Sequence, residues 1–276
     1  MWERRYKIVE PGRTDTNIRY YSDADLRRLL NISILNQNGI KISQIADLDE
    51  QQLKSRVLDL SLDSRYSNVQ IETLVISMLE MDEKKFVNSL SGSIIKYGFE
   101  ETVETILFPF LERIGILWQA GTILPAQEHF MSNLIRQKLI VAIDGEMQNS
   151  SYNGSRIIFF LPEKEMHEIG LLFYSLIARK EGVDVVYLGQ SVPMGDLEVV
   201  NRIRPCDAFF TSIISSINKD DVDKLLTGYK EMFNDIPFFI TGLQIRELKP
   251  NLPDTFSEIS SVKTFKKALK LLRYQD

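Results

Sequence analysis

The segment Ile157–Gly170, with the sequence IIFFLPEKEMHEIG, is the strongest indication of the fold of the second half of this chain. Its first five residues are apolar, as is typical of a strand that is buried on both faces of a sheet. Further apolar runs follow at Val183–Leu188, Ala208–Ile214 and Pro237–Ile240, with a weaker one at Phe256–Val262. Patterns of helical spacing lie between them, near residues 168–181, 195–204, 219–233 and 263–273. This alternation predicts a flavodoxin-like (Rossmann-like) domain over residues 153–276, with a parallel five-stranded sheet.

The loop after the first of these strands contains the pattern Glu165-x-His167-x-x-Gly170. Ligands of parallel α/β sheets bind beyond the carboxyl ends of the strands, where this loop is expected to lie. A neutral imidazole is a good nitrogen donor to a transition metal, and a carboxylate two residues earlier can accept the other ring N–H. Glycine leaves room where a bulky ligand must pass the backbone. The plainer interpretation is a loop histidine that caps a helix or bonds to a neighbour.

The pattern resembles the Asp-x-His-x-x-Gly signature of cobalamin-binding domains in which a histidine replaces the cofactor's own base below the cobalt. The resemblance implies that His167 is the lower cobalt ligand and that the nucleotide tail enters a slot beside the first strand. That family also has Ser-x-Leu after its third strand and Gly-Gly after its fourth. Here Ser212 begins Ser-Ile-Ile, and Thr241-Gly242 stands in place of the two glycines. Ser212 is expected to hydrogen-bond the tail, whereas Thr241 is a departure that affects the width of the slot.

Residues 67–148 have a wholly helical pattern, which predicts a four-helix bundle. The expected helices lie near residues 69–81, 83–97, 99–118 and 125–147, with a kink at Pro109 in the third. The chain has two histidines, and the second one, His129, lies in this region within Trp118-x9-Glu128-His129. Without further context, Trp118 would be assigned to the core and Glu128-His129 to the surface.

The Trp118-x9-Glu128-His129 pattern resembles the cap of light-sensing, adenosylcobalamin-dependent repressors. The resemblance implies that Trp118 and Glu128 cover the 5′-deoxyadenosyl group. It also implies that His129 can take the upper cobalt position after photolysis. A large flat side chain can shield a cobalt–carbon bond from water, and a carboxylate can accept hydrogen bonds from ribose hydroxyls. The two histidines would then form the lower and upper parts of one site.

Residues 1–62 predict a β-hairpin with its turn at Glu10–Gly12, followed by a helix that Ser22 caps. Trp2-Glu3-Arg4-Arg5-Tyr6 and the hairpin are similar to the MerR family of winged helix-turn-helix regulators. The resemblance implies DNA contacts from Arg4, Arg5, Arg13 and Arg19. In that family the first helix and most of the recognition helix precede the Trp-Glu segment, and this sequence lacks them. We therefore expect either a truncated start or a chain that binds DNA poorly. A solvated hairpin with ordinary surface arginines is the plainer alternative.

The order of these regions resembles that of B12-dependent photoreceptor repressors. It predicts a homo-oligomer, a dimer or tetramer, whose binding to a DNA operator is controlled by adenosylcobalamin. A corrinoid methyl carrier of a methyltransferase system and a partner-binding antirepressor remain alternatives. A single cysteine and two histidines argue against a zinc site or a catalytic triad, so we expect no enzyme. The single cysteine, the lack of a signal peptide and the lack of a long apolar run predict a cytoplasmic protein without a membrane span.

Overall fold

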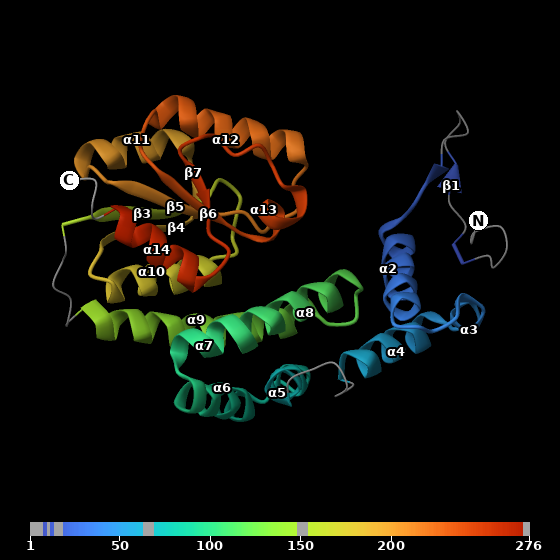
Figure 1. The fold of residues 1–276 in the computed structure, drawn as a ribbon. Coiled ribbons are helices and arrows are strands. Elements are labelled where there is room, and N and C mark those ends of the chain that lie inside the picture. The colour runs from blue at the N-terminus through green and yellow to red at the C-terminus, as the bar shows by residue number, and fades with distance from the viewer. Residues whose placement is uncertain (1–7, 10–11, 14–18, 63–68, 148–153, 273–276) are drawn as a thin grey trace. The chain divides into compact units, whose positions relative to one another are not determined.

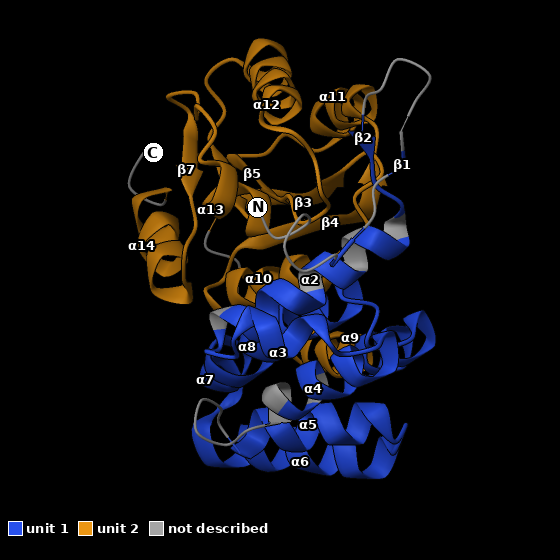
Figure 2. Ribbon diagram, turned by 90° about the vertical axis from the view of Figure 1, so that its right-hand side faces the viewer, with its two compact units in different colours: residues 1–134 blue, residues 135–276 orange. Residues whose placement is uncertain are grey.

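The computed structural model describes residues 8–9, 12–13, 19–62, 69–147 and 154–272 (Figure 1). The chain forms two compact units, Met1–Leu134 and Ile135–Asp276, which Figure 2 colours separately. The boundary between them falls inside one long helix, α9 (Pro125–Met147). The division into three domains, at 1–62, 67–148 and 153–276, stays a prediction. None of the helices in the described ranges is both long and apolar enough to cross a membrane.

The first unit begins with a small antiparallel hairpin of β1 (Gly12–Arg13) and β2 (Arg19–Tyr20). The hairpin was expected, but the position of its turn was wrong. Gly12 lies in the first strand, opposite Tyr20, rather than in the turn. A Cβ atom on Gly12 would lie 2.3 Å from the ring of Tyr20, so this glycine permits the close approach of an aromatic side chain.

Three helices follow the hairpin, namely α2 (Asp23–Gln37), α3 (Ile42–Ala46) and α4 (Glu50–Leu62). The predicted cap of α2 is confirmed. The Ser22 hydroxyl accepts a hydrogen bond from the backbone N–H of Asp25, and the Asp25 carboxylate accepts one from the backbone N–H of Ser22. On the buried side of α2, the amide of Asn31 donates to the backbone carbonyl of Ala120, 2.9 Å away. This bond joins α2 to the end of a later helix of the same unit.

The remaining helices of the first unit match the predicted positions closely. They are α5 (Val69–Leu79), α6 (Glu83–Tyr97), α7 (Phe99–Thr102), the π-helix η1 (Val103–Leu107), α8 (Phe108–Gln119) and the start of α9. A kink was expected at Pro109, and the structure has a π-helical turn just before it. There the N–H of Phe108 bonds to the carbonyl of Val103, five residues earlier. Proline cannot donate to the preceding turn, so a wider turn at this place is physically reasonable.

The second unit confirms the predicted five-stranded parallel sheet, with strand order β4-β3-β5-β6-β7, as in flavodoxin-like folds. The strands are β3 (Arg156–Pro162), β4 (Asp184–Val192), β5 (Ala208–Ser212), β6 (Phe238–Thr241) and β7 (Phe256–Glu258). The helices are α10 (Ile169–Lys180), α11 (Met194–Ile203), α12 (Lys219–Phe233), α13 (Leu243–Leu248) and α14 (Val262–Leu272).

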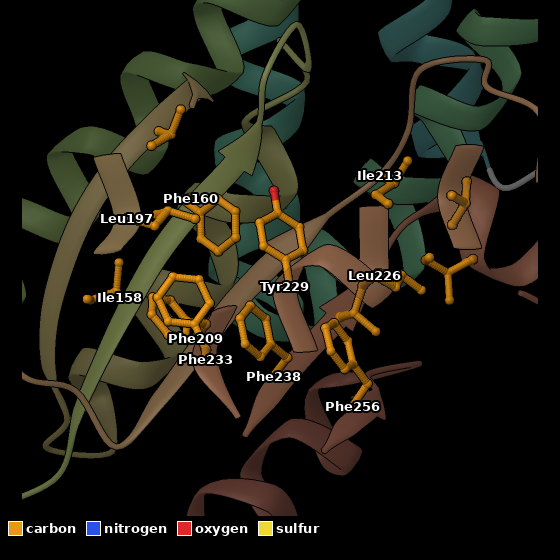
Figure 3. Close-up of a cluster of buried hydrophobic side chains, with 14 residues drawn as sticks. Ile158, Phe160, Leu197, Phe209, Ile213, Leu226, Tyr229, Phe233, Phe238 and Phe256 are labelled. Atoms are coloured by element: carbon orange, nitrogen blue, oxygen red, sulfur yellow. The ribbon is translucent and has the colours of Figure 1, made fainter. Parts of the chain in front are cut away.

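Helices cover both faces of this sheet, α10 and α14 on one and α11 and α12 on the other (Figure 1). On the α12 face, Phe209 of β5 packs on Phe233 and stacks on Phe238, within a larger aromatic cluster (Figure 3). On the opposite face, Phe210 lies 5.0 Å from the ring of Tyr174 in α10 and 5.1 Å from that of Phe265 in α14. Successive strand residues therefore point to opposite helical layers.

Three details of this unit differ from the prediction. Helix α13 was not expected, because its six residues are too few to show a clear period. The last strand is short and ends at Glu258 instead of reaching Val262. The second strand was expected at Val183–Leu188, but β4 continues to Val192 through irregular pairing with β3. Such bulges are common beside functional sites, and this one lies at the carboxyl edge of the sheet.

Candidate functional site

The loop between β3 and α10, residues 163–168, is hydrogen-bonded to the end of β4. The backbone N–H of Lys164, a residue with a positive φ of 71°, donates to the hydroxyl of Ser191 at 3.0 Å. The N–H of Ser191 donates to the carbonyl of Glu165 at 3.1 Å, and the amide of Gln190 donates to the carbonyl of Met166 at 2.6 Å. An unfavourable backbone conformation persists only where its surroundings hold it, so this loop is built to present a defined geometry.

His167 is oriented by the buried carboxylate of Glu165. The ring Nδ1 lies 2.6 Å from Oε1 of Glu165, while the imidazole itself is 59% exposed. The Glu165 side chain is only 4% exposed. When Nδ1 carries the proton and donates it to the carboxylate, Nε2 holds the lone pair that a metal can accept. The carboxylate–histidine arrangement expected from the sequence is therefore present, and the role of His167 as a cobalt ligand stays a prediction.

Glu165 also binds the turn that follows β5. Its Oε2 accepts hydrogen bonds from the backbone N–H groups of Ile214, at 2.8 Å, and Ser215, at 2.7 Å. Burial alone would raise the pKa of Glu165, but the bonds from the His167 ring and from the backbone N–H groups of Ser215, His167 and Ile214 outweigh it. They lower the pKa from 4.5 to about 2. The carboxylate is therefore ionised at neutral pH and acts as an acceptor.

Ser215 is a site residue that was not predicted from the sequence. Its hydroxyl lies 3.0 Å from Oε1 of Glu165 and 3.3 Å from Nδ1 of His167. The expected serine was Ser212, which ends β5. Ser215 follows a strand of the same sheet, so its place at the carboxyl edge was a usable signal. Its contact with Glu165, which lies 50 residues earlier in the chain, could not be predicted from the sequence.

Gly170, Ser212 and Thr241 lie on the same side of the sheet. Ser212 and Thr241 are paired across β5 and β6, two residues beyond Phe210 and Phe239. Both of these phenylalanines contact Phe265 of α14, so strand alternation puts Ser212 and Thr241 on the face that α10 and α14 cover. Gly170 lies in the first turn of α10, and a Cβ atom there would have no heavy atom within 4 Å.

The tail of a cobalamin was predicted beside Gly170, and the two predicted glycines differ in what requires them. Gly170 has no positive φ, and no packing contact among the residues that the structure describes requires a glycine there. Open space next to its Cα would admit a bulky group that passes the backbone, and Ser212 is buried on the same face of the sheet. Gly242 differs, because it has a φ of 119° and its Cβ would lie 2.2 Å from the carbonyl oxygen of Ile213. Gly242 is thus required by the close approach of the loops after β5 and β6.

A second polar cluster beside the loop was also missed. Glu168, the residue after His167, is buried and pairs with Nε of Arg136 in α9. Its Oε2 accepts the hydroxyl of Tyr187 in β4 at 3.0 Å. Burial and the negative charge of Glu168 raise the pKa of Tyr187, which therefore remains a hydrogen-bond donor. Nothing in the local sequence marks Arg136, because its partner lies 32 residues away in another element.

The residues predicted on the helical bundle lie in the first unit. Trp118, near the end of α8, is 52% exposed, so it does not belong to the core as its size alone would suggest. Glu128 and His129 lie near the start of α9, and His129 Nδ1 is 2.8 Å from Oε2 of Glu128. The His129 side chain is 72% exposed. The first unit thus presents an exposed tryptophan and an exposed histidine that is paired with a partly buried carboxylate, and the role of these residues stays a prediction.

The structure describes the four arginines predicted to contact DNA to different extents. Arg4 and Arg5 lie outside the described residues. Arg13 lies in β1, where only its backbone is described, and Arg19 is exposed in β2, opposite Arg13. The hairpin therefore brings two of the four positions together on neighbouring strands, as a DNA-contacting wing would require.

Two parts of the chain match models of known protein families. Residues 1–52 match the model of the MerR HTH family regulatory protein. Residues 70–142, which span α5 to most of α9, match a B12 binding domain. Together with the flavodoxin-like unit, these matches support a MerR-type regulator of transcription that binds cobalamin.

Two relatives match this chain over most of their length. The chain is 29% identical to the HTH-type transcriptional repressor CarH of Myxococcus xanthus, over 89% of this chain and 83% of CarH. It is 24% identical to the repressor CarA of the same organism, over 89% of this chain and 81% of CarA. Among solved structures, the monomethylamine corrinoid protein of Methanosarcina barkeri is similar with a TM-score of 0.55. That match has 16% identity and covers 74% of this chain and 100% of that chain, so it supports the fold.

Proposed function

We propose that this chain is a transcriptional regulator that uses adenosylcobalamin to sense light. The observation that carries the proposal is the Glu165–His167 pair, a buried carboxylate that orients an exposed imidazole at the ligand-binding edge of the sheet. In the proposal, His167 binds cobalt from below, and Ser212 and Thr241 line the slot for the nucleotide tail beside Gly170. The likeness to the repressor CarH over most of both chains supports the regulatory part.

The upper side of the cofactor is assigned to the helical bundle. Trp118 and Glu128 would cover the adenosyl group, since an exposed indole can stack on it and a carboxylate can accept its ribose hydroxyls. Adenosylcobalamin supplies, when bound, a cobalt–carbon bond that green light cleaves. After illumination, His129 would take the upper position. In the dark, the chain is expected to form a dimer or tetramer that binds DNA, and light is expected to separate its subunits.

The test is an absorbance spectrum of the full chain with adenosylcobalamin, before and after green light, combined with size-exclusion chromatography. We expect a stable spectral change on illumination and a fall in apparent mass. The His167→Ala variant should lose the lower-ligand signature already in the dark. The His129→Ala variant should bind normally in the dark and differ from wild type after illumination. A chain that shows neither a spectral change nor a mass change would refute the proposal.

A corrinoid methyl carrier is the second candidate, because the fold matches a corrinoid protein over the full length of that protein. The match of residues 1–52 to the MerR family favours the regulator, since a methyl carrier does not need a DNA-binding region. Affinities for methylcobalamin and adenosylcobalamin separate the two functions. A regulator that uses Trp118 and Glu128 should prefer the adenosyl form, and both forms should bind equally well if those residues do not contact the upper ligand.

A partner-binding antirepressor would share the cofactor site but not the DNA site. Gel shifts in the dark, with and without adenosylcobalamin, decide between these roles. Cofactor-dependent retardation of a DNA duplex supports the proposed regulator. Cofactor binding without any retardation, at low salt, would favour the antirepressor instead.

A further inference from the structure

Three polar side chains from three elements meet directly beside His167. Glu168 is the N-cap residue of α10, Arg136 projects from α9, and Tyr187 comes from β4. The Glu168 side chain is 8% exposed, and Arg136 is 49% exposed. One carboxylate oxygen of Glu168 pairs with the Arg136 guanidinium, and the other accepts the Tyr187 hydroxyl. Both carboxylate oxygens are thus engaged by groups from outside the loop.

The charge of Glu168 makes this cluster sensitive to Arg136. A buried carboxylate is costly unless an opposite charge and hydrogen bonds compensate for lost hydration. Tyr187 supplies a neutral hydrogen bond, whereas Arg136 supplies the compensating charge. The guanidinium is half exposed and loses less hydration than the carboxylate does. Without Arg136, Glu168 would therefore move toward water and take the loop with it.

The backbone of Glu168 connects this cluster to the cobalt-ligand loop. Its N–H donates to the carbonyl of Met166 at 3.0 Å, and its carbonyl accepts the N–H of Leu172 in α10 at 2.8 Å. His167 lies between Met166 and Glu168, so a displacement of Glu168 moves His167. The same displacement would strain the bond from Nδ1 of His167 to Glu165.

Helix α9 also carries the residues assigned to the upper side of the cofactor. Glu128 and His129 lie near its start, and Arg136 follows His129 after seven residues. Seven residues are about two helical turns, so His129 and Arg136 share a face of one continuous helix. Any shift or rotation of α9 is therefore transmitted to Arg136.

We propose that Arg136 is a positioning residue whose ion pair with Glu168 ties the His167 loop to helix α9. The position of the helix that bears Glu128 and His129 then sets the geometry of the lower ligand. This inference rests on the proposed function for its cobalt chemistry, but the tie between Arg136 and the loop can be tested without a cofactor.

The first experiment is amide hydrogen exchange on the cofactor-free full chain. In Arg136→Gln, amides of the loop, including those of Met166 and His167, should exchange about tenfold faster or more, while amides of β3 and β5 keep their protection. Arg136→Lys, which retains the charge, should restore most of the loop's protection. The matched control is Arg202→Gln, because Arg202 forms an exposed ion pair with Glu198 in α11 of the same unit. Unchanged loop exchange in Arg136→Gln would overturn the tie.

The second experiment reads the lower ligand directly. Cobalamin is bound to chains that contain ¹⁵N-labelled histidine and reduced to the Co(II) form, and the nitrogen splitting in its electron paramagnetic resonance spectrum is recorded. We expect Arg136→Gln to lose part of the histidine coupling and to bind cobalamin about tenfold more weakly, as is common when a partner of a metal ligand is disturbed. Full histidine coupling and wild-type affinity in Arg136→Gln would overturn the inference. If the wild-type chain itself bound no cobalamin, the proposed function would fail. The hydrogen-exchange result would still show whether the ion pair of Arg136 holds the His167 loop.

Discussion

The Nδ1 atom of His167 lies 2.6 Å from Oε1 of Glu165, and this carboxylate is shared between two loops. Its other oxygen accepts the backbone N–H groups of Ile214 and Ser215, in the turn after β5. The orientation of the exposed His167 ring therefore depends on two loops, one after β3 and one after β5. These loops lie at the same edge of the sheet but are far apart in the sequence. Glu165 is the residue whose replacement should affect the site most strongly after His167 itself.

Replacing Glu165 by glutamine should weaken cobalamin binding about 10- to 100-fold, as is typical for partners of metal-binding histidines. The amide presents one acceptor where the carboxylate has two, so its NH2 group would face an N–H donor. The stability of the cofactor-free chain should fall by about 1–3 kcal/mol. Titration with cobalamin and thermal unfolding check both effects. Glu163→Gln, an exposed position in the same loop, is the control and should change neither quantity.

Replacing Gly170 by alanine should separate folding from binding. No atom lies within 4 Å of the added Cβ, and alanine favours helices over glycine, so stability should be unchanged or rise by up to about 1 kcal/mol. Cobalamin binding should weaken, because the methyl group enters the space assigned to the nucleotide tail. Calorimetric unfolding and cofactor titration measure the two effects.

The control for Gly170 is Gly195→Ala. Gly195 is likewise the second residue of a helix, α11, and its Cβ would also meet no atom within 4 Å. It should show a similar stability change with normal cobalamin affinity. Equal affinities for wild type and Gly170→Ala would argue against a tail slot at this place. Gly242→Ala should instead destabilise the chain, because its Cβ would collide with the backbone of Ile213.

Replacing Arg19 by alanine should reduce the salt dependence of DNA binding. A phosphate contact from a single arginine contributes about one unit to the slope of log K against log salt. Binding of the adenosylcobalamin-loaded chain to a mixed-sequence duplex, measured at several salt concentrations, gives this slope. Arg56→Ala, an exposed position on α4 outside the hairpin, should leave the slope unchanged. If Arg19→Ala kept the wild-type slope, the conclusion would be that Arg19 does not contact a DNA phosphate.

Cys206, the single cysteine of the chain, should be a slow-reacting reporter of folding. Burial, with a smaller effect from the charge of Asp207, raises the pKa of its thiol from 9.0 to about 12. Three pKa units mean about a thousandfold less thiolate at pH 8 than an unshifted thiol would have. Alkylation of the folded chain should therefore still accelerate between pH 9 and pH 10. A rate that levels off near pH 9 would contradict this prediction, and the urea-unfolded chain serves as the comparison.

The sheet was predictable because its signals are local. Continuous apolar runs marked the strands, and Glu165, His167 and Gly170 followed the first of them within one loop. The π-turn before Pro109 and the extension of β4 beyond Leu188 were not predictable in this way. Both depend on how a segment packs against neighbours, and hydrophobic period alone does not contain that information.

The residues that the sequence did not single out are those whose partners are distant along the chain. Ser215 meets Glu165 across 50 residues, and Arg136 meets Glu168 across 32. Neither Ser215 nor Arg136 belongs to a recognisable local motif. Each contacts its partner because the parallel topology brings loops from distant parts of the sequence to one edge of the sheet. By contrast, the Glu165–His167 contact spans two residues, so chemistry and spacing alone were sufficient to predict it.

The sharing of Glu165 between two loops also bears on how such a site can be transplanted. Nine residues, 162–170, contain the motif, yet two of the donors that hold its carboxylate, Ile214 and Ser215, belong to a distant turn. A peptide or a foreign scaffold that received the nine residues alone would inherit the imidazole without its orientation. A graft would need the turn after β5 and the end of β4 as well, which makes the three strands β3, β4 and β5, and not the motif, the smallest portable unit of this site.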